Sequence, residues 1–353
     1  MSDLPFVAVI MAGGQGQRFW PLSTPERPKQ FLDLQRTGRT LIQSTYDRVV
    51  GLAGDSNNVL VATAARYVPL VREQLPDVPR RNVLVEPMSR DSAPAIALAN
   101  LLIERRFGDV VAGFFSSDHL IGAGQGFSDV IRTAARTAQT EDGLVTVGIK
   151  PTRPATGYGY IQTGESIGSG YKVGRFVEKP NIHIAESYLD SGDYLWNAGI
   201  FVWRVSAALA ELDKYVPELM GPLRQAVQED RVEEVFPTLQ RISIDYALME
   251  HTNRAYVVPA AFQWDDIGDW VALERHMQHE DIGHGANTVV GRHIGLDTSG
   301  NIVYTEDPED VIVTLGVHDL VIVKRGHAIL LVHKNRVEEI KTLLADERMG
   351  GLF

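Results

Sequence analysis

The 353-residue chain contains no cysteine, which excludes disulfide bonds, thiolate chemistry and sulfur-ligated zinc sites. It has no apolar run long enough to cross a membrane, and no charged-then-apolar leader precedes its first expected strand. A surplus of basic residues is also absent, because the formal net charge is −11 at pH 7. We therefore expect a cytoplasmic protein that binds neither membrane nor nucleic acid, although a few local cations would suffice to bind a nucleotide.

Two common phosphate-binding fingerprints are missing from the first glycine-rich turn. The dinucleotide fingerprint G-x-G-x-x-G, counted from Gly14, would need a glycine where Phe19 stands. The phosphate loop G-x-x-x-x-G-K-[ST] needs a Gly-Lys-Ser or Gly-Lys-Thr run, which occurs nowhere in the chain. The turn must therefore be interpreted from its own residues.

The stretch at residues 7–34 is nevertheless suited to binding a polyphosphate. An apolar run at 6–11 predicts a buried parallel strand, and it ends at the Ala-Gly-Gly of 12–14. Glycines let backbone N–H groups approach and point at a ligand, and Arg18 and Lys29 add positive charge. A glycine pair alone would indicate only a turn. Three glycines, an arginine and a Pro-Lys at this spacing favour a phosphate site.

The order of the expected elements predicts an α/β protein. An apolar content of 44% and a charged content of 22% are ordinary for a globular protein, and the length suggests one large domain with a lesser one. Strand-like and helix-like segments alternate through the first half, which indicates a parallel sheet covered on both faces. The expected strands are 58–62, 82–86, 110–115, 144–149, 173–180 and 200–203, and the expected helices include 40–50, 66–74, 127–139 and much of 206–236.

A different pattern begins near residue 286. Short apolar runs follow one another at fairly even spacing, separated by glycines and acids, and a helical period returns only at 337–344. This pattern predicts a small region of stacked short strands, so we expect domains at 1–283 and 284–353. The apolar runs are 288–290, 302–303, 311–313, 320–323 and 328–332.

Asp118 and a group of three aspartates at 265–269 are candidates for a metal site. Asp118 follows an expected strand, and open α/β sheets bind ligands beyond the carboxyl ends of their strands. An aspartate that only caps the next turn is the alternative. Asp265, Asp266 and Asp269 lie within five residues and repel one another unless a cation or backbone donors compensate. A cap of the following helix would need only one of them.

The first loop resembles the signature of the sugar-phosphate nucleotidyltransferase family, which reads approximately G-G-x-G-x-R-x-x-P-L and then P-K. Its continuation at residues 28–32, Pro-Lys-Gln-Phe-Leu, is similar to the branch that makes GDP-mannose. The resemblance covers nearly the whole chain and is most specific at the loop, at Glu178-Lys179-Pro180 and at 264–270. The matching loop residues are Gly13, Gly14, Gly16, Arg18, Pro21, Leu22, Pro28 and Lys29.

This resemblance implies a fold and a reaction. The fold is a Rossmann-like nucleotidyltransferase domain with a mixed, mostly parallel sheet, followed by a small C-terminal β region like a short β-helix. The reaction joins GTP and mannose 1-phosphate to give GDP-mannose and pyrophosphate. A homodimer formed through the β region is a further expectation from the family.

The resemblance also assigns nucleotide binding to two segments. In the loop, backbone N–H groups and Arg18 would hold the leaving phosphates, and Lys29 would reach the α-phosphate. The second segment has Asp91 and Ser92 where the family has Asn and Thr; both keep helix-capping ability, but the added charge leaves the role of Asp91 open. The implied nucleotide-binding residues are Ala12, Gly13, Gly14, Gly16, Glu86, Pro87, Ser92 and Ala93, and the implied catalytic residues are Arg18, Lys29 and Lys179.

The acceptor and metal sites are implied by later motifs. By resemblance, Glu178 binds sugar hydroxyls, Lys179 binds the sugar phosphate, and Gly159 and Asn197 lie at the sugar. The family pattern Trp-x-Asp-x-Gly-x-Trp selects Asp266, which together with Asp118 suits Mg²⁺ or another divalent cation that keeps waters and substrate phosphates as its other ligands. The roles of His119 and Asp265 stay open, and Asp245 is expected to be partly structural.

Three alternatives remain at this stage. The acceptor could be another hexose or a heptose 1-phosphate, or the chain could be a non-catalytic regulatory paralogue that binds nucleotide sugar. A nucleotide-sugar-dependent glycosyltransferase would commonly carry an Asp-x-Asp motif, which Ser117-Asp118-His119 does not supply. Arg325 and His327 stand where some longer relatives carry a threonine and an acid, and we interpret them as variation in a structural part.

Overall fold

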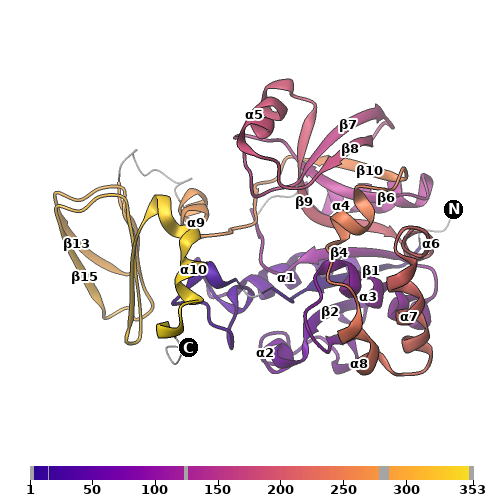
Figure 1. Cartoon of the computed structure of the whole chain (residues 1–353), viewed down its shortest axis with the longest axis horizontal. Helices are drawn as coiled ribbons and strands as arrows, with labels where there is room; N and C mark the ends of the chain where they lie inside the picture. Colours follow the sequence, from indigo (N-terminus) through magenta and orange to yellow (C-terminus); the bar gives the residue numbers. More distant parts are fainter. Residues whose placement is uncertain (1–3, 15, 123–125, 278–285, 350–353) are drawn as a thin grey trace. The chain divides into compact units, whose positions relative to one another are not determined.

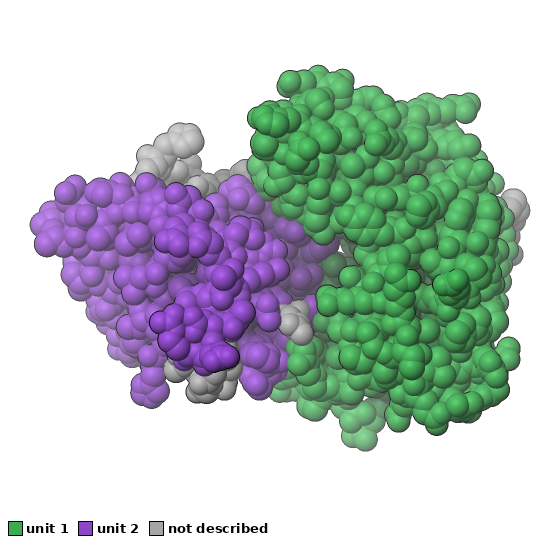
Figure 2. Space-filling model, in the orientation of Figure 1, with its two compact units in different colours: residues 1–13, 42–117, 121–264 green, residues 14–41, 118–120, 265–353 purple. Residues whose placement is uncertain are grey.

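The computed structural model describes residues 4–14, 16–122, 126–277 and 286–349, and it divides into two compact units. Unit 1 comprises Met1–Gly13, Ile42–Ser117 and Ile121–Trp264, and unit 2 comprises Gly14–Leu41, Asp118–Leu120 and Asp265–Phe353 (Figure 2). The first loop therefore belongs to the same unit as the C-terminal strands. The expected domain boundary between residues 283 and 284 lies outside the described residues.

Unit 1 is built on a nine-stranded mixed sheet in the order β3-β2-β1-β4-β9-β6-β10-β8-β7 (Figure 1). The pairs β3–β2, β2–β1, β1–β4 and β6–β10 are parallel, and β9 pairs with its neighbours in antiparallel fashion. The expected α/β fold class is confirmed. The strands are β1 Phe6–Met11, β2 Val59–Ala64, β3 Val83–Glu86, β4 Val111–Ser116, β6 Leu144–Ile149, β7 Tyr160–Ser166, β8 Tyr171–Val177, β9 Tyr194–Arg204 and β10 Ala255–Ala260.

The helices of unit 1 follow the expected alternation. Asp91 is the N-cap of α3 and its side chain accepts a hydrogen bond from the Ser92 N–H, so its expected capping ability is confirmed. The α-helices are α1 Leu41–Ala53, α2 Val68–Gln74, α3 Ser92–Phe107, α4 Gly126–Thr140, α5 Ile182–Ser191, α6 Val205–Tyr215, α7 Pro217–Gln228 and α8 Val232–Val235. Shorter turns are η3 Ser56–Asn58, η4 Ala65–Tyr67, η5 Arg80–Asn82, η6 Phe236–Thr238 and the π-helical η7 Asp245–Met249.

The strands of unit 2 form a short coil. One sheet has the order β12-β14-β16-β17, and β13 pairs with β15 in a second sheet. The pairs β12–β14, β14–β16 and β13–β15 are parallel, as a stack of coil turns requires, so the expected β-helix-like region is confirmed. The strands are β12 Thr288–Val290, β13 Arg292–Leu296, β14 Ile302–Thr305, β15 Val311–Leu315, β16 Leu320–Arg325 and β17 Ala328–His333.

The loop of unit 2 shares a core with these strands. The ring of Phe19 lies 5.1 Å from that of Trp270, which in turn lies 5.5 Å from that of Tyr304. These aromatic contacts explain why the loop groups with the C-terminal region. Its other elements are η1 Gln17–Phe19, η2 Lys29–Phe31, α9 Trp270–Met277, η8 Lys334–Glu339, α10 Ile340–Leu344 and η9 Glu347–Met349; β5 Leu120–Ile121 and β11 Trp264–Asp265 lie where the chain passes between units.

Some local elements differ from those expected. A strand was expected only over 200–203, whereas β9 begins at Tyr194 and contains Asn197. Gly199 lies within β9 at φ 64°, beside a register irregularity that interrupts the β-pattern. β13 was not expected, because its Arg-His-Ile-Gly-Leu sequence offers only a weak alternation.

None of the helices described for this chain is long and apolar enough to span a bilayer.

Candidate active site

Lys29 joins three segments of unit 2 that are far apart in the sequence. Its Nζ lies 2.9 Å from Asp118 Oδ2 and donates to the carbonyl oxygens of Asp266 at 2.9 Å and Ile267 at 3.0 Å. The residue is only 4% exposed, so all three ammonium donors are satisfied within the protein. Lys29 therefore fixes the loop against both candidate metal ligands.

Gly16 allows the loop to pass close to Lys29. It adopts φ 56°, and a Cβ built on it would lie 2.3 Å from Lys29 Cβ, far inside van der Waals contact. The neighbouring backbone is fixed by two side chains: Ser23 Oγ donates to Gly16 O at 2.7 Å, and Gln30 Nε2 donates to Gly14 O at 2.9 Å. A side chain at position 16 would displace Lys29.

The three acids of the 265–269 turn have different roles. Asp265 Oδ1 accepts from the Ile267 N–H at 2.8 Å, and Asp269 Oδ1 accepts from the Ala272 N–H at 2.8 Å in the first turn of α9. Both carboxylates therefore stabilise local backbone. Within the described part of the chain, no hydrogen bond or ion pair is recorded for the Asp266 carboxylate. It is the one of the three that is left for a ligand.

Charge around Asp118 and Asp266 is incompletely balanced. Burial raises the pKa of Asp266, and the nearby His119 and Lys29 offset only part of that rise. Burial also opposes ionisation of Asp118, but Lys29 and His119 outweigh it and hold the pKa of this carboxyl below its usual value. Burial lowers the pKa of His119, whose Nε2 lies 3.9 Å from Asp118 Oδ1. The negative charges of Asp118 and Asp266 oppose part of this lowering.

The pair of carboxylates fits a hard divalent cation. Among the residues that the structure describes, no group of three or more His, Cys, Asp or Glu could hold a metal by itself. Mg²⁺ is commonly bound by one or two carboxylates together with waters and substrate phosphates, so two protein ligands suffice. Asp118 and Asp266 are suited to such a site, because the Asp266 carboxylate forms no hydrogen bond or ion pair with the residues that the structure describes.

Arg18 lies at this cluster but is engaged by a residue that sequence reasoning missed. Its Nη1 lies 2.7 Å from Glu338 Oε1, on η8. A Cβ built on Gly268 would lie 3.4 Å from the same Nη1 and 3.7 Å from Asp266 Oδ1, which places Arg18 beside the metal candidate. Glu338 stands 320 positions after Arg18, and no local motif signals the contact.

The nucleotide candidates of unit 1 lie at the carboxyl edge of its parallel strands. Glu86 ends β3 and is only 4% exposed, and burial raises the pKa of its carboxyl to about 7. A Cβ built on Gly13 would lie 3.8 Å from Glu86 Oε1, so this carboxyl faces the turn after β1. Ala12 N–H donates to Ala62 O, and half-buried Pro87 follows Glu86.

Ser92 and Ala93 have internal partners. Ser92 Oγ accepts a hydrogen bond from the Ile244 N–H at 2.8 Å, and the Ala93 N–H donates to Ile242 O at 3.1 Å. These bonds dock the start of α3 against residues 242–244. The two residues thus support the shape of the segment that carries Glu86, while their direct contact with nucleotide stays a prediction.

The acceptor candidates form a second cluster in unit 1. Lys179 Nζ lies 2.8 Å from Glu178 Oε1; burial opposes its charge, but this contact raises the pKa of Lys179. Its side chain remains 61% exposed, so it can reach a ligand. A Cβ built on Gly159 would lie 2.6 Å from Glu178 Oε2, so a side chain at position 159 would displace the Glu178 carboxylate.

Asn197 orients a buried acid in this cluster. Its Oδ1 accepts from Thr146 Oγ1 at 2.9 Å and from the Gly199 N–H at 3.1 Å, and its Nδ2 donates to Asp245 Oδ1 at 3.0 Å. Burial, with repulsion from Glu178, raises the pKa of Asp245 to about 7. Asp245 therefore belongs to the site more closely than the sequence indicated.

The chain matches two known families. Residues 7–281 match the Nucleotidyl transferase family, and residues 291–346 match the MannoseP isomerase/GMP-like beta-helix domain. Because the first match covers most of the chain, the chain is a nucleotidyltransferase.

Similar proteins show which family of nucleotidyltransferases the chain belongs to. The chain is 37% identical to an Escherichia coli mannose-1-phosphate guanylyltransferase, covering 99% of this chain and 75% of that protein. It is 38% identical to a Klebsiella pneumoniae mannose-1-phosphate guanylyltransferase, covering 94% and 72%. A Thermus thermophilus crystal structure described as a mannose-1-phosphate geranyltransferase is 34% identical, with a TM-score of 0.88 over 98% of this chain and 99% of that chain. The chain belongs to the mannose-1-phosphate guanylyltransferase family.

Proposed function

We propose that this chain transfers GMP from GTP to mannose 1-phosphate and releases pyrophosphate. The observation that carries the proposal is the Lys29 network, which ties the glycine loop to the carboxylates of Asp118 and to the Asp266 turn. The identity to relatives named as mannose-1-phosphate guanylyltransferases, over nearly the whole chain, supports the choice of substrates.

The reaction is an in-line displacement at phosphorus. A phosphate oxygen of mannose 1-phosphate forms a bond to the α-phosphorus of GTP, and the bond from that phosphorus to the bridging oxygen of the β-phosphate breaks. The electron pair leaves with pyrophosphate. Because the nucleophile is already an anion at neutral pH, no general base is needed. The protein must align two anions that repel each other and neutralise the charge that develops.

Each cluster has one part of this task. Backbone N–H groups of the loop and Arg18 hold the phosphates that leave. Lys29 would reach the α-phosphate by exchanging one of its two carbonyl acceptors for a phosphate oxygen. Lys179 binds the incoming phosphate, and Glu178 accepts from sugar hydroxyls. Asp118 and Asp266 would hold a divalent cation such as Mg²⁺, which supplies Lewis-acid neutralisation of phosphate charge when bound.

Glu86 suits recognition of guanine. A carboxylate offers two neighbouring acceptors, and guanine presents two neighbouring donors, N1–H and the 2-amino group, on its Watson–Crick edge. The other common bases place a donor next to an acceptor at that edge. Ionisation of the buried Glu86 would then be favoured by the base, which compensates for its burial.

The exposed face of β13 and β15 supports the expected homodimer. Ile294, Leu296, Val313 and Leu315 are between 63% and 71% exposed, and the strand register places them on one side of the sheet. A contiguous apolar surface of this kind is typical of an interface. We propose that a second copy of the chain covers it.

A substrate panel tests the proposal. Purified protein is supplied with GTP, ITP, ATP, UTP or dTTP and with the 1-phosphates of mannose, glucose, galactose or a heptose, and pyrophosphate release is measured. The account predicts fastest release with GTP and mannose 1-phosphate, and slower release with ITP, which lacks the 2-amino group. A different preferred sugar would support the alternative acceptor, and no release with any pair would support the non-catalytic paralogue.

A further inference from the structure

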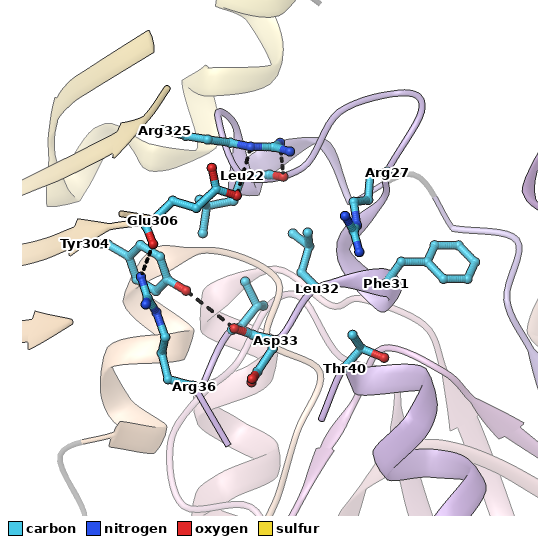
Figure 3. Close-up of a pocket in the computed structure, with 11 residues that line it drawn as sticks. Leu22, Arg27, Phe31, Leu32, Asp33, Arg36, Thr40, Tyr304, Glu306 and Arg325 are labelled. Atoms are coloured by element: carbon cyan, nitrogen blue, oxygen red, sulfur yellow. Dashed lines mark hydrogen bonds and ion pairs between the residues drawn. The ribbon is translucent and has the colours of Figure 1, made fainter. Parts of the chain in front are cut away.

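A cavity of about 290 Å³ lies in unit 2, apart from the Asp118–Asp266 cluster (Figure 3). Its walls come from the loop at residues 22–40 and from the strands near Tyr304 and Arg325. The lining includes apolar groups from Leu22, Phe31 and Leu32. The volume suits a small metabolite.

Three arginines line this cavity, two from the loop at residues 22–40 and one from β16. Arg325 donates from Nη1 to Pro21 O and Leu22 O, and its Nε lies 3.2 Å from Glu306 Oε1. Arg36 donates from Nη2 to Thr305 O and Glu306 O and lies over the Tyr304 ring. Arg27 is exposed, and no hydrogen bond or ion pair is recorded for its guanidinium among the described residues. Several N–H donors thus remain available.

The acids of the lining do not cancel this charge. Asp33 is occupied by backbone donors, since its oxygens accept from the N–H groups of Thr37 at 3.0 Å and Gly38 at 2.7 Å. Glu306 is occupied by Arg325. Three guanidinium groups against two carboxylates leave one uncompensated positive charge, carried by Arg27.

We propose that this cavity binds a small phosphorylated metabolite that carries an apolar or ring-shaped body. Guanidinium groups recognise phosphate through paired N–H donors. Donors from three guanidinium groups suit the three terminal oxygens of a phosphate ester better than the two of a carboxylate. Apolar groups of the lining, such as those of Leu22 and Leu32, supply the surface for the body of the ligand.

The short helix η2 connects the cavity to the proposed active site. Phe31 lines the cavity and is the last residue of η2, whose first residue is Lys29. A ligand in the cavity would contact the Phe31 end of η2 and so bias the contacts of Lys29 with Asp118 and the Asp266 turn. The cavity is thus an effector site, and this regulatory part of the inference rests on the nucleotidyl transfer proposed above. Coupling must then act equally in both directions between effector and GTP.

Calorimetry with model ligands tests the site directly. The probes are phenyl phosphate, inorganic phosphate, benzoate and phenol, titrated into the full-length chain. Phenyl phosphate should bind most tightly, because it alone has both the phosphate and the ring. Arg27→Gln should weaken it about tenfold, as expected for one lost charge-assisted contact, and Arg27→Lys should weaken it less. Arg39→Gln is the matched control, since Arg39 lies in the same loop but does not line the cavity.

Kinetics then test the regulatory part. Phenyl phosphate should change the KM for GTP in the wild type and in Arg39→Gln, but not in Arg27→Gln at the same concentration. An absence of binding, or equal binding to Arg27→Gln, would overturn the site. Binding without a change in KM would overturn the regulation. Tighter binding of benzoate would overturn the choice of phosphate. The calorimetry does not depend on which sugar phosphate is the acceptor, so failure of the proposed reaction would be seen separately in the substrate panel.

Discussion

At the scale of single residues, the 265–269 turn shows what sequence alone could and could not decide. Only the family pattern selected Asp266, because the sequence alone cannot distinguish the chemistry of three aspartates that lie so close together. The structure supplies a physical reason for the choice, since Asp265 and Asp269 accept from nearby backbone N–H groups. Two of the three acids therefore stabilise the local backbone, which is consistent with the proposed role of the third as a metal ligand.

Substitution of Asp266 tests this division of roles. Asp266→Asn should fold normally and lose roughly a hundredfold or more in turnover with Mg²⁺, because a cation ligand is removed. Asp265→Asn is the control in the same turn. Its amide oxygen can still accept from the Ile267 N–H, so most of the activity should remain. Near-normal turnover in Asp266→Asn would remove this residue from the metal site.

Glu338 is expected to compete with the nucleotide for Arg18. The two side chains are 2.7 Å apart and remain partly exposed, so their attraction is modest. Glu338→Gln should lower the KM for GTP by up to about fivefold, with less effect at high salt. Glu339→Gln, which removes a neighbouring glutamate paired with Arg336, should leave KM unchanged. A rise in KM would show instead that Glu338 holds Arg18 in its productive position.

At the scale of elements, strands and loops were predicted best where the pattern was strong. The buried runs at β1, β2, β4 and β6 appear where expected, because short, largely apolar segments of this kind favour buried strands. β13 was missed because exposed Ile294 and Leu296 do not alternate with a clear polar face. The strand expected at 200–203 starts six residues too late, because Gly199 interrupts the pattern of β9 and marks an irregularity inside it.

Gly16 and Gly38 lie in the same loop, and comparing them distinguishes the need for a positive φ from the need for close steric contact. Gly16 and Gly38 both have positive φ, at 56° and 81°, but only at Gly16 would an added Cβ approach Lys29. Gly16→Ala should lower kcat by about tenfold or more, because the added methyl group would displace Lys29 from its proposed position at the α-phosphate. Gly38→Ala should cost about 1 kcal/mol of stability and leave kcat unchanged. The kinetics should be compared with thermal unfolding; equal kcat in the two variants would contradict the role of Gly16.

At the scale of the whole molecule, contacts between distant parts of the sequence escaped prediction. The first loop and the C-terminal strands form one unit, which no local period reveals. Arg325 was interpreted as variation in a structural part, yet it donates to Pro21 O and Leu22 O and so links β16 to the loop. Its partners lie about 300 positions away, and such pairings depend on the complete fold.

The dimer is tested through the exposed β13–β15 face. The double variant Leu296→Glu with Val313→Glu places two like charges in the proposed interface and should give monomers, while the wild type should sediment as a dimer. Ile182→Glu is the control, because Ile182 is exposed on α5 in unit 1. A monomeric wild type, or a double variant that remains dimeric, would contradict the proposed interface.

The central claim is that this chain holds two different substrates with two groups of residues, and Lys179 tests it most directly. Steady-state kinetics of Lys179→Ala should be measured against both GTP and mannose 1-phosphate. Because Lys179 is exposed and its ion pair within the described residues is with the neighbouring Glu178, the protein should remain folded. The account predicts that kcat/KM for mannose 1-phosphate falls by about a hundredfold, as for loss of one charge on a reacting phosphate, while the KM for GTP changes little. A change confined to GTP would contradict it.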